Sequence, residues 1–368
     1  MEGPRSIKPE EIPSLGQLLD TVFSRGKAGE MFRFFPVFLA ESNAANLFVY
    51  TDKGRVVSHV GTALHWASIA GCTVGVACVG AVATYEEYRG KGLATQLMDL
   101  ACRRARAWGA DFMMISGGRG LYRRLGAADV GCEHDATVSG EAAERLAFEG
   151  FALTEYTDAD FDVCQTSYDR KIAHFIRPRS EWSAFLAARV AACTDVDVWV
   201  ARVRGAPCGY WVAAQPPRDG EVRVIEFAGD AAALSATLHL LLQRYSCSSA
   251  RLHLQAEDMV LRRLLVDAGA ELKDANASGT YLLLDADRLI RRLTPFFEAR
   301  VGRDAASTLQ CRVEGDRYLF ACGGDHAELH GKAAAAEFIF GNRTRSASRG
   351  CLGEAFPVPP LWYGLNYV

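Results

Sequence analysis

Residues 84–97 read TYEEYRGKGLATQL, in which a short basic loop, Arg89-Gly90-Lys91-Gly92, stands directly before an apolar pattern with helical spacing. The pattern runs from Leu93 to Trp108, and Gly109 is a typical helix stop. The amino end of a helix presents unpaired N–H groups and a partial positive charge, and glycines let an anion approach the backbone closely. The stretch therefore predicts a loop and helix that bind a diphosphate.

Two common phosphate-binding motifs do not account for this loop. The sequence contains no GxxxxGK[ST] motif, and no GxGxxG joins a strand to a long helix. Gly118-Arg119-Gly120 is the nearest approach to the second motif, but the helix expected after it is too short. Taken alone, the loop is equally well interpreted as a tight turn with solvated charges.

The composition sets limits on the partners. The chain has 368 residues, of which 49% are hydrophobic and 23% are charged, and its formal net charge is -3. This length predicts two or three domains, and the charge balance shows no bias toward nucleic acid. No apolar run is long enough for a membrane helix, and MEGPRSIKPEEI has no hydrophobic signal core. We expect a cytoplasmic protein with no nucleic-acid or membrane partner.

The cysteines and histidines suggest no metal or disulfide framework. The eleven cysteines are scattered and include no CxxC pair, so we expect most of them to be small buried side chains. His326 and His330 are spaced so that a helix would place them on one face, where they could share a metal. A polar helix start is the favoured interpretation, and no metal is predicted.

The order of elements predicts an α/β fold with mixed sheets. From residue 1 to 148 we expect a strand, a helix, an antiparallel meander, the long helix after Gly92, a buried strand at 111–116 and a short helix near Tyr122. This order differs from the regular strand–helix alternation of a doubly wound sheet.

The remaining chain divides into two further parts. Residues 149–285 repeat the meander, long helix, strand and short helix, which suggests a diverged copy of the first domain. Residues 286–368 contain a helix, a hairpin around Gly315, and a second helix, HAELHGKAAAAEFIF, before an aromatic, proline-rich tail. Proline disfavours helix in that tail, and its aromatic residues predict that it docks on another surface.

The order of strand, basic loop, long helix, strand and tyrosine resembles the GNAT (GCN5-related) N-acetyltransferases. Their signature Arg/Gln-x-x-Gly-x-Gly/Ala corresponds here to Arg89, Gly92 and Ala94. The resemblance implies that acetyl-CoA is the cosubstrate and that the loop N–H groups bind its diphosphate. It also implies that the edge of a strand pairs with the pantetheine arm. The implied cofactor-binding residues are Val82, Ala83, Thr84, Arg89, Gly90, Lys91, Gly92, Leu93, Ala94, Gly117 and Gly118.

The same resemblance assigns a role to Tyr122, which follows Gly117-Gly118-Arg119-Gly120-Leu121. Members of this family often carry a tyrosine here that protonates the departing thiolate of coenzyme A. A phenol is a plausible acid for a thiolate expelled into a dry cleft. The plain alternative is a half-buried aromatic side chain on a short helix.

A closer resemblance, over most of the chain, is to the Eis-type (enhanced intracellular survival) acetyltransferases. It implies two tandem GNAT folds, the second degenerate, followed by a small sterol-carrier-like α/β domain, and assembly as a homo-oligomer. In the second copy, Asp230 stands where the phosphate loop would be, so that copy should not bind coenzyme A. The general base of these enzymes is the C-terminal carboxylate, which here belongs to Val368. Glu86 and Glu87 are the competing bases.

The leading interpretation is an acetyl-CoA-dependent N-acetyltransferase in which a primary amine attacks the thioester directly in a ternary complex. The acceptor implied by the Eis-type resemblance is an amine of an aminoglycoside-like molecule, a polyamine or a lysine. No cysteine has a recognisable base partner, so an acyl-enzyme is not expected. The alternative from another class is an acyl-CoA-sensing or lipid-binding protein without turnover.

Overall fold

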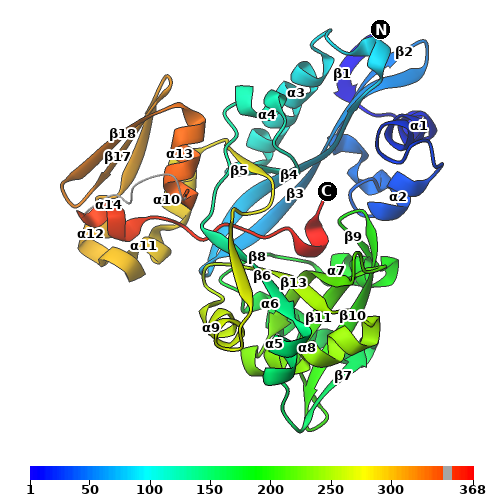
Figure 1. The fold of residues 1–368 in the computed structure, drawn as a ribbon. Coiled ribbons are helices and arrows are strands. Elements are labelled where there is room, and N and C mark those ends of the chain that lie inside the picture. Colours follow the sequence, from blue (N-terminus) through cyan, green and yellow to red (C-terminus); the bar gives the residue numbers. More distant parts are fainter. Residues whose placement is uncertain (343–349) are drawn as a thin grey trace.

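The structure is a computed structural model that describes residues 1–342 and 350–368. Its strands form three sheets, with seven, eight and three strands, and helices pack against each of them (Figure 1). The predicted mixed α/β class is confirmed. Within the described residues, no helix is both long enough and apolar enough to cross a membrane.

The first sheet has the order β1-β2-β3-β4-β5-β15, and β8 pairs with the far end of β3. Neighbouring strands are antiparallel except for β4 and β5, which are parallel. Residues Val76 to Val79 of β4 pair with β5, and the rest of β4 beyond Val79 does not. The strands are β1 (Glu2–Ser6), β2 (Leu47–Asp52), β3 (Arg55–Ile69), β4 (Cys72–Thr84), β5 (Phe112–Ile115), β8 (Ala173–Phe175) and β15 (Thr280–Leu283).

Helices α1 (Ile12–Phe23) and α2 (Glu30–Phe34) lie on one face of this sheet, and α3 (Leu93–Trp108) and α4 (Gly120–Arg124) lie on the other (Figure 1). The 3-10 turns η1 (Pro9–Glu11), η2 (Glu41–Asn46) and η3 (Glu86–Tyr88) connect these elements. Helix α3 ends where the sequence predicts, because Gly109 adopts φ 105° and its N–H closes the last turn.

The second sheet has the order β14-β6-β13-β12-β11-β10-β7, with β9 paired to β10. Its strands are β6 (Glu133–Ser139), β7 (Phe151–Glu155), β9 (Val190–Ala191), β10 (Thr194–Val203), β11 (Ala206–Gln215), β12 (Glu221–Gly229), β13 (Ser249–Leu254) and β14 (Glu271–Ala275). The accompanying helices are α5 (Gly140–Arg145), α6 (Phe161–Asp169), α7 (Arg179–Ala188), α8 (Ala231–Tyr245) and α9 (Met259–Asp267), with the 3-10 turn η4 (Asp158–Asp160).

The two large sheets exchange strands. Strand β6 precedes residue 148 yet pairs with β13 of the second sheet, and β15 follows the second sheet in the chain yet pairs with β5 of the first. The strands of each large sheet therefore come from both sides of the predicted domain boundaries at residues 148 and 285. The boundaries themselves stay predictions. The order β10-β11-β12-α8-β13-α9 does repeat β2-β3-β4-α3-β5-α4, as the sequence suggests.

The last part contains a three-stranded antiparallel sheet, β16-β17-β18. Its elements are α10 (Ala286–Arg292), α11 (Thr294–Val301), α12 (Arg303–Ser307), β16 (Gln310–Glu314), β17 (Arg317–Cys322), β18 (Asp325–His330), α13 (Gly331–Phe340) and α14 (Gly350–Ala355). The prediction that a helix begins near His326 is wrong, because residues 325–330 pair with β17 as a strand. The helix begins at Gly331. His326 and His330 therefore lie on β18 and not on a helix face. Part of the predicted third domain, residues 343–349, lies outside the described residues.

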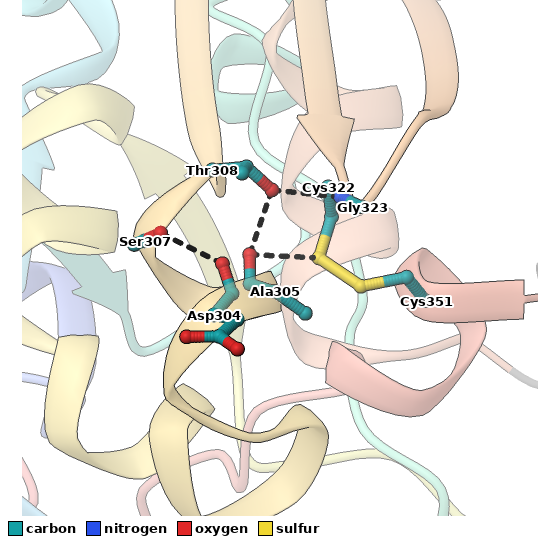
Figure 2. Close-up of a disulfide and its surroundings, with 7 residues drawn as sticks. All are labelled: Asp304, Ala305, Ser307, Thr308, Cys322, Gly323 and Cys351. Atoms are coloured by element: carbon teal, nitrogen blue, oxygen red, sulfur yellow. Dashed lines mark hydrogen bonds between the residues drawn. A yellow bond between two sulfur atoms is a disulfide. The ribbon is translucent and has the colours of Figure 1, made fainter.

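The expectation of no disulfide is also wrong. Cys322 at the end of β17 and Cys351 in α14 form a disulfide, beside a turn in which the Gly323 N–H donates to the Thr308 hydroxyl (Figure 2). The two cysteines are 29 residues apart and belong to no spacing motif, so only the fold brings them together. Other cysteines, such as Cys72, Cys78 and Cys102, are buried thiols, as predicted.

The C-terminal tail docks along the junction between the two large sheets, which confirms the expectation for it (Figure 1). It runs without regular structure to the 3-10 turn η5 (Gly364–Asn366), and it is held at several points along its length. The hydroxyl of Tyr281 bonds to the backbone of Leu361, and the Trp362 indole N–H donates to the Ile225 carbonyl. The buried apolar side chains of the tail are Phe356, Val358, Leu361, Tyr363, Leu365 and Val368.

The turn η5 is fixed by a buried ion pair. Arg177 donates two parallel bonds to Glu226, of 2.9 and 2.6 Å, and its Nε donates to the Asn366 side chain at 2.6 Å. Glu226 also accepts from the Leu365 N–H at 3.0 Å, and from the Tyr210 hydroxyl. Burial alone would raise the pKa of the Glu226 carboxyl, but the charge and hydrogen bonds of Arg177 outweigh burial and lower it.

Replacing Glu226 by alanine is expected to lower the free energy of unfolding by about 3–5 kcal/mol, because Arg177 would remain as an unpaired buried charge. Urea unfolding followed by circular dichroism measures the change. Asp267→Ala removes the exposed Arg263–Asp267 pair and serves as the control, with an expected cost below about 1 kcal/mol. Equal losses in the two variants would contradict the role given to the buried pair.

Candidate active site

A cleft of about 740 Å³ opens between the end of β4, the start of α3 and the short helix α4. Most of the residues named from the sequence for cofactor binding line it, together with Tyr122. The lining residues are Val22, Val82, Thr84, Tyr88, Arg89, Gly90, Gly92, Leu93, Ala94, Thr95, Arg119, Leu121, Tyr122 and Arg124. The fold thus brings together two segments that are about 30 residues apart in the sequence.

The loop before α3 leaves its backbone N–H groups accessible. Gly90 and Gly92 both adopt φ 75°, a conformation that side chains other than glycine rarely take. A Cβ on Gly90 would meet nothing within 4 Å, so the loop faces open space. No side chain caps the amino end of α3, which starts at Leu93. These are the conditions under which a helix end binds an anionic group.

The corresponding helix of the second copy is closed. The carboxylate of Asp230 accepts a hydrogen bond from the Ala233 N–H at 2.9 Å, so α8 carries a side-chain cap at its first turn. An anion approaching this helix end would also meet the negative charge of Asp230.

Positive charge gathers around the first cleft. Arg89 comes from the loop, where its Nε donates to the Thr84 carbonyl at 3.3 Å. Arg119 directly precedes the short helix α4, Arg124 is the last residue of that helix, and both line the opposite wall. The sequence analysis missed these two residues, although an arginine before the predicted short helix and another at its end were a signal that could have pointed to them.

Four residues named from the sequence do not line the cleft. Ala83 is buried within the β3–β4 pair, and the ammonium of Lys91 stands over the ring of Tyr88 at 4.6 Å. Gly117 and Gly118 form the turn after β5, where the Gly117 N–H donates to the Ile115 carbonyl at 2.7 Å. These glycines shape the start of α4.

Tyr122 is buried, with 5% of its surface exposed, and it faces the cleft from α4. Burial raises the pKa of its phenol above the ordinary value, although the nearby charge of Arg119 acts in the opposite direction. The phenol is therefore protonated at neutral pH, the state that a general acid requires.

Strand β4 carries a bulge next to the cleft. Ala81 adopts φ 49°, and the register with β3 shifts at this point. The Nδ1–H of His59 donates to the Ala81 carbonyl at 2.8 Å and so supports the bulge. His59 is fully buried, and burial lowers its pKa to about 4, so the ring is neutral. No sequence signal marked His59 or Ala81.

Val368, named from the sequence as the base, lies against the same strand. A Cβ on Gly80 would clash with the Val368 carbonyl carbon and would lie 2.7 Å from its oxygen, so only glycine permits this approach. Glu86 and Glu87, the competing bases, are exposed and do not line the cleft, and Glu87 pairs with Arg55 at 3.3 Å.

A second, narrower cavity of about 20 Å³ lies beside Val368, between α2, β3 and the second sheet. Aromatic residues of the MFRFFPVF stretch line it, together with the end of the tail. Over residues 1–342 and 350–368 there is no group of three or more His, Cys, Asp or Glu side chains that could hold a metal ion.

Comparison with known proteins agrees with this geometry. Residues 4–129 match a family model described as an acetyltransferase (GNAT) domain, which covers about a third of the chain. No curated protein sequence matches the chain.

Several solved structures share the fold over nearly the whole length. A GCN5-related N-acetyltransferase from Kribbella flavida has a TM-score of 0.67 at 16% identity, covering 99% of each chain. One from Anabaena variabilis has a TM-score of 0.66 at 13% identity, covering 97% of this chain and 98% of its own. Eis1 from Mycobacterium abscessus has a TM-score of 0.59 at 14% identity, with the same coverage. At these identities the likeness concerns the fold alone. The matched region is a GNAT acetyltransferase domain, and the protein that carries it is an acetyltransferase.

Proposed function

We propose that the protein is an acetyl-CoA-dependent N-acetyltransferase that acetylates a primary amine. The observation that carries this proposal is the uncapped amino end of α3 behind Gly90 and Gly92, in a cleft that also holds the protonated Tyr122. Such a helix end can bind the diphosphate of coenzyme A. The phenol can give a proton to the thiolate that leaves.

Coenzyme A would bind with its diphosphate on the N–H groups of residues 90–94. Arg89, Arg119 and Arg124 line the same cleft and would neutralise its phosphates. Val82 and Thr84 lie at the end of β4, beyond the point where β4 stops pairing with β5. The free edge of β4 would pair with the pantetheine amides as an added strand does.

In the reaction, the neutral amine attacks the thioester carbonyl carbon, so a C–N bond forms and the C–S bond breaks. The thiolate that leaves takes the phenolic proton of Tyr122, and the new amide gives its extra proton to a base. The products are an N-acetylated amine and coenzyme A with a free thiol. The proton accepted by the base later returns to Tyr122 through solvent.

The base in this proposal is the α-carboxylate that Val368 carries as the last residue of the sequence. A base is needed because the amine nitrogen becomes positively charged when the C–N bond forms, and it must lose a proton to become an amide. The contact of Val368 with Gly80 supports this role, since it puts the carboxylate beside the bulge of β4. Glu86 and Glu87 would have to leave an exposed turn to replace it.

The wider architecture proposed is Eis-like. The repeated order of elements and the capped helix α8 support a second GNAT fold that has lost its cofactor site, with a sterol-carrier-like part after it. The full-length fold likeness to Eis1 from Mycobacterium abscessus is consistent with this arrangement. A cytoplasmic location and a homo-oligomer stay predictions.

Replacing Arg89 and Arg119 together by alanine is expected to weaken acetyl-CoA binding about a hundredfold or more, because each charged hydrogen bond contributes about 1.5–3 kcal/mol. Calorimetric titration measures the Kd. Arg103→Ala, an exposed arginine on α3 outside the cleft, is the matched control and should leave the Kd unchanged. An unaltered Kd in the double variant would argue against this cofactor site.

Tyr122→Phe is expected to lower kcat by about 10²–10⁴-fold, the usual contribution of a general acid, with little change in the Kd for acetyl-CoA. In the wild type, deprotonation of Tyr122 should lower activity only at a higher pH than for an ordinary tyrosine, because burial raises the pKa of its phenol. Thiol release recorded between pH 6 and 10 tests both points. A phenylalanine variant with wild-type kcat would remove Tyr122 from the mechanism.

Adding Gly-Ser-Gly after Val368 is expected to abolish turnover and leave the Kd for acetyl-CoA unchanged, since the carboxylate would be moved away from Gly80. The same three residues added before Met1, which is exposed, form the control. Steady-state thiol release and calorimetry give the two quantities. Unimpaired turnover by the C-terminally extended protein would show that another group is the base.

A further inference from the structure

One short stretch of strand β4 serves both faces of the first sheet. Gly80 faces the tail, and Val368 approaches it so closely that no Cβ would fit between them. Val82 and Thr84, two and four residues further on, line the cleft at the start of α3. On a regular strand, residues at even spacing point to one face, so the alternation of β4 has to change after Gly80.

The bulge at Ala81 makes this change. Gly61 of β3 pairs with Gly80, and His59 of β3 pairs with Ala83 of β4. Two steps along β3 therefore match three steps along β4. The extra residue turns every later side chain of β4 to the opposite face. Without it, Ala83 would face the cleft, and the side chains that now line the cleft would face the tail.

Side-chain contacts agree with this alternation. On the face of the cleft, the hydroxyls of Ser58 and Thr84 lie 2.8 Å apart across the two strands. On the other face, Cε1 of His59 lies 3.0 Å from the position that a Cβ on Gly61 would take. Gly61 is the pairing partner of the glycine that Val368 contacts. Because paired residues point to the same face, His59 lies on the face of the sheet that receives the tail.

His59 supports the bulge through one hydrogen bond. Its Nδ1–H donates to the Ala81 carbonyl oxygen at 2.8 Å. The ring is fully buried, and burial lowers its pKa to about 4, so the ring is neutral and its Nε2 is an acceptor. Within residues 1–342 and 350–368, this Nε2 has no hydrogen-bond partner. A buried acceptor without a partner lowers stability, so the bond to the bulge explains the histidine better than packing does.

Building on the proposed function, we propose that His59 is a positioning residue for acetyl transfer, which holds the bulge of β4 in the conformation that the reaction needs. His59 does not line the cofactor cleft, and it acts through the backbone of the neighbouring strand. On one side of the bulge, Gly80 receives the carboxylate of the tail, and on the other side Val82 and Thr84 offer the strand edge to the pantetheine arm. The bulge therefore sets the distance between the base and the thioester. A displacement of about 1 Å between such groups can lower a rate about a hundredfold.

The hydrogen-bond donor is removed in His59→Leu and in His59→Met, two apolar variants whose side chains pack differently. Thiol release is measured with the amine that the wild type acetylates fastest among spermidine, kanamycin and lysine. For both variants we expect kcat to fall about 10–100-fold, because the base and the thioester are no longer held at the right distance. The Kd for acetyl-CoA, measured by calorimetry, should rise by less than about tenfold, since one neutral hydrogen bond is lost.

Two further variants complete the comparison. His59→Asn is the rescue variant, because its amide nitrogen is as many bonds from the backbone as Nδ1 is and can donate to the same carbonyl oxygen. It should restore most of the kcat. His174→Leu is the matched control, because His174 is also a buried histidine, whose Nδ1 lies 2.6 Å from the Lys171 carbonyl oxygen. It belongs to β8, which pairs with the far end of β3, so its loss should leave kcat and Kd unchanged.

Urea unfolding of the same preparations separates positioning from folding. His59→Leu, His59→Met and His59→Asn should unfold at similar midpoints, because all three lack the unpartnered Nε2. The inference would be overturned by a loss of kcat that is equal in all three, that is absent from the two apolar variants, or that follows a lower urea midpoint. If the wild type binds acetyl-CoA and acetylates an amine, such a result removes only the role of His59. If the wild type does neither, the proposed function fails and the inference fails with it.

Discussion

The ion pair between Arg177 and Glu226 is the interaction on which the arrangement of the site depends. It is fully buried between the second sheet and the tail, and both partners also bind the turn at residues 364–366. A Cβ on Gly364 would clash with the Glu226 carboxylate, so the turn is seated directly on the pair. A buried pair is costly to form and more costly to break. Its effect here is to hold the last residues of the chain in one place.

From that turn the chain leads to Val368, which meets β4 of the first sheet at Gly80. The second sheet therefore shapes the site in the first one, while its own helix α8 is capped by Asp230. The two large sheets are also linked by backbone pairing, because β6 pairs with β13 of the second sheet and β15 pairs with β5 of the first. On the other side, Asp111 accepts from Arg288 and Arg292 of α10, at 2.7 and 2.5 Å, and joins the last part to β5. The site depends on all three parts of the chain.

Much of this could be predicted from the sequence, because the relevant signals were local. The spacing from Leu93 to Gly109 marked α3, and the glycines before it marked the open helix end. The strand exchange could not be predicted, since β6 and β15 have ordinary strand patterns that carry no information about their partners. The bulge at Ala81, the support from His59 and the disulfide of Cys322 also depend on tertiary contacts. At His326, strand pairing with β17 overrode the helical spacing.

The central claim is that one helix end, at the start of α3, binds acetyl-CoA, while the matching end of α8 is closed by Asp230. The most direct test is the stoichiometry of acetyl-CoA binding to the full chain, measured by isothermal titration calorimetry. The account predicts one molecule bound per chain. Two molecules per chain, or no binding at all, would contradict it.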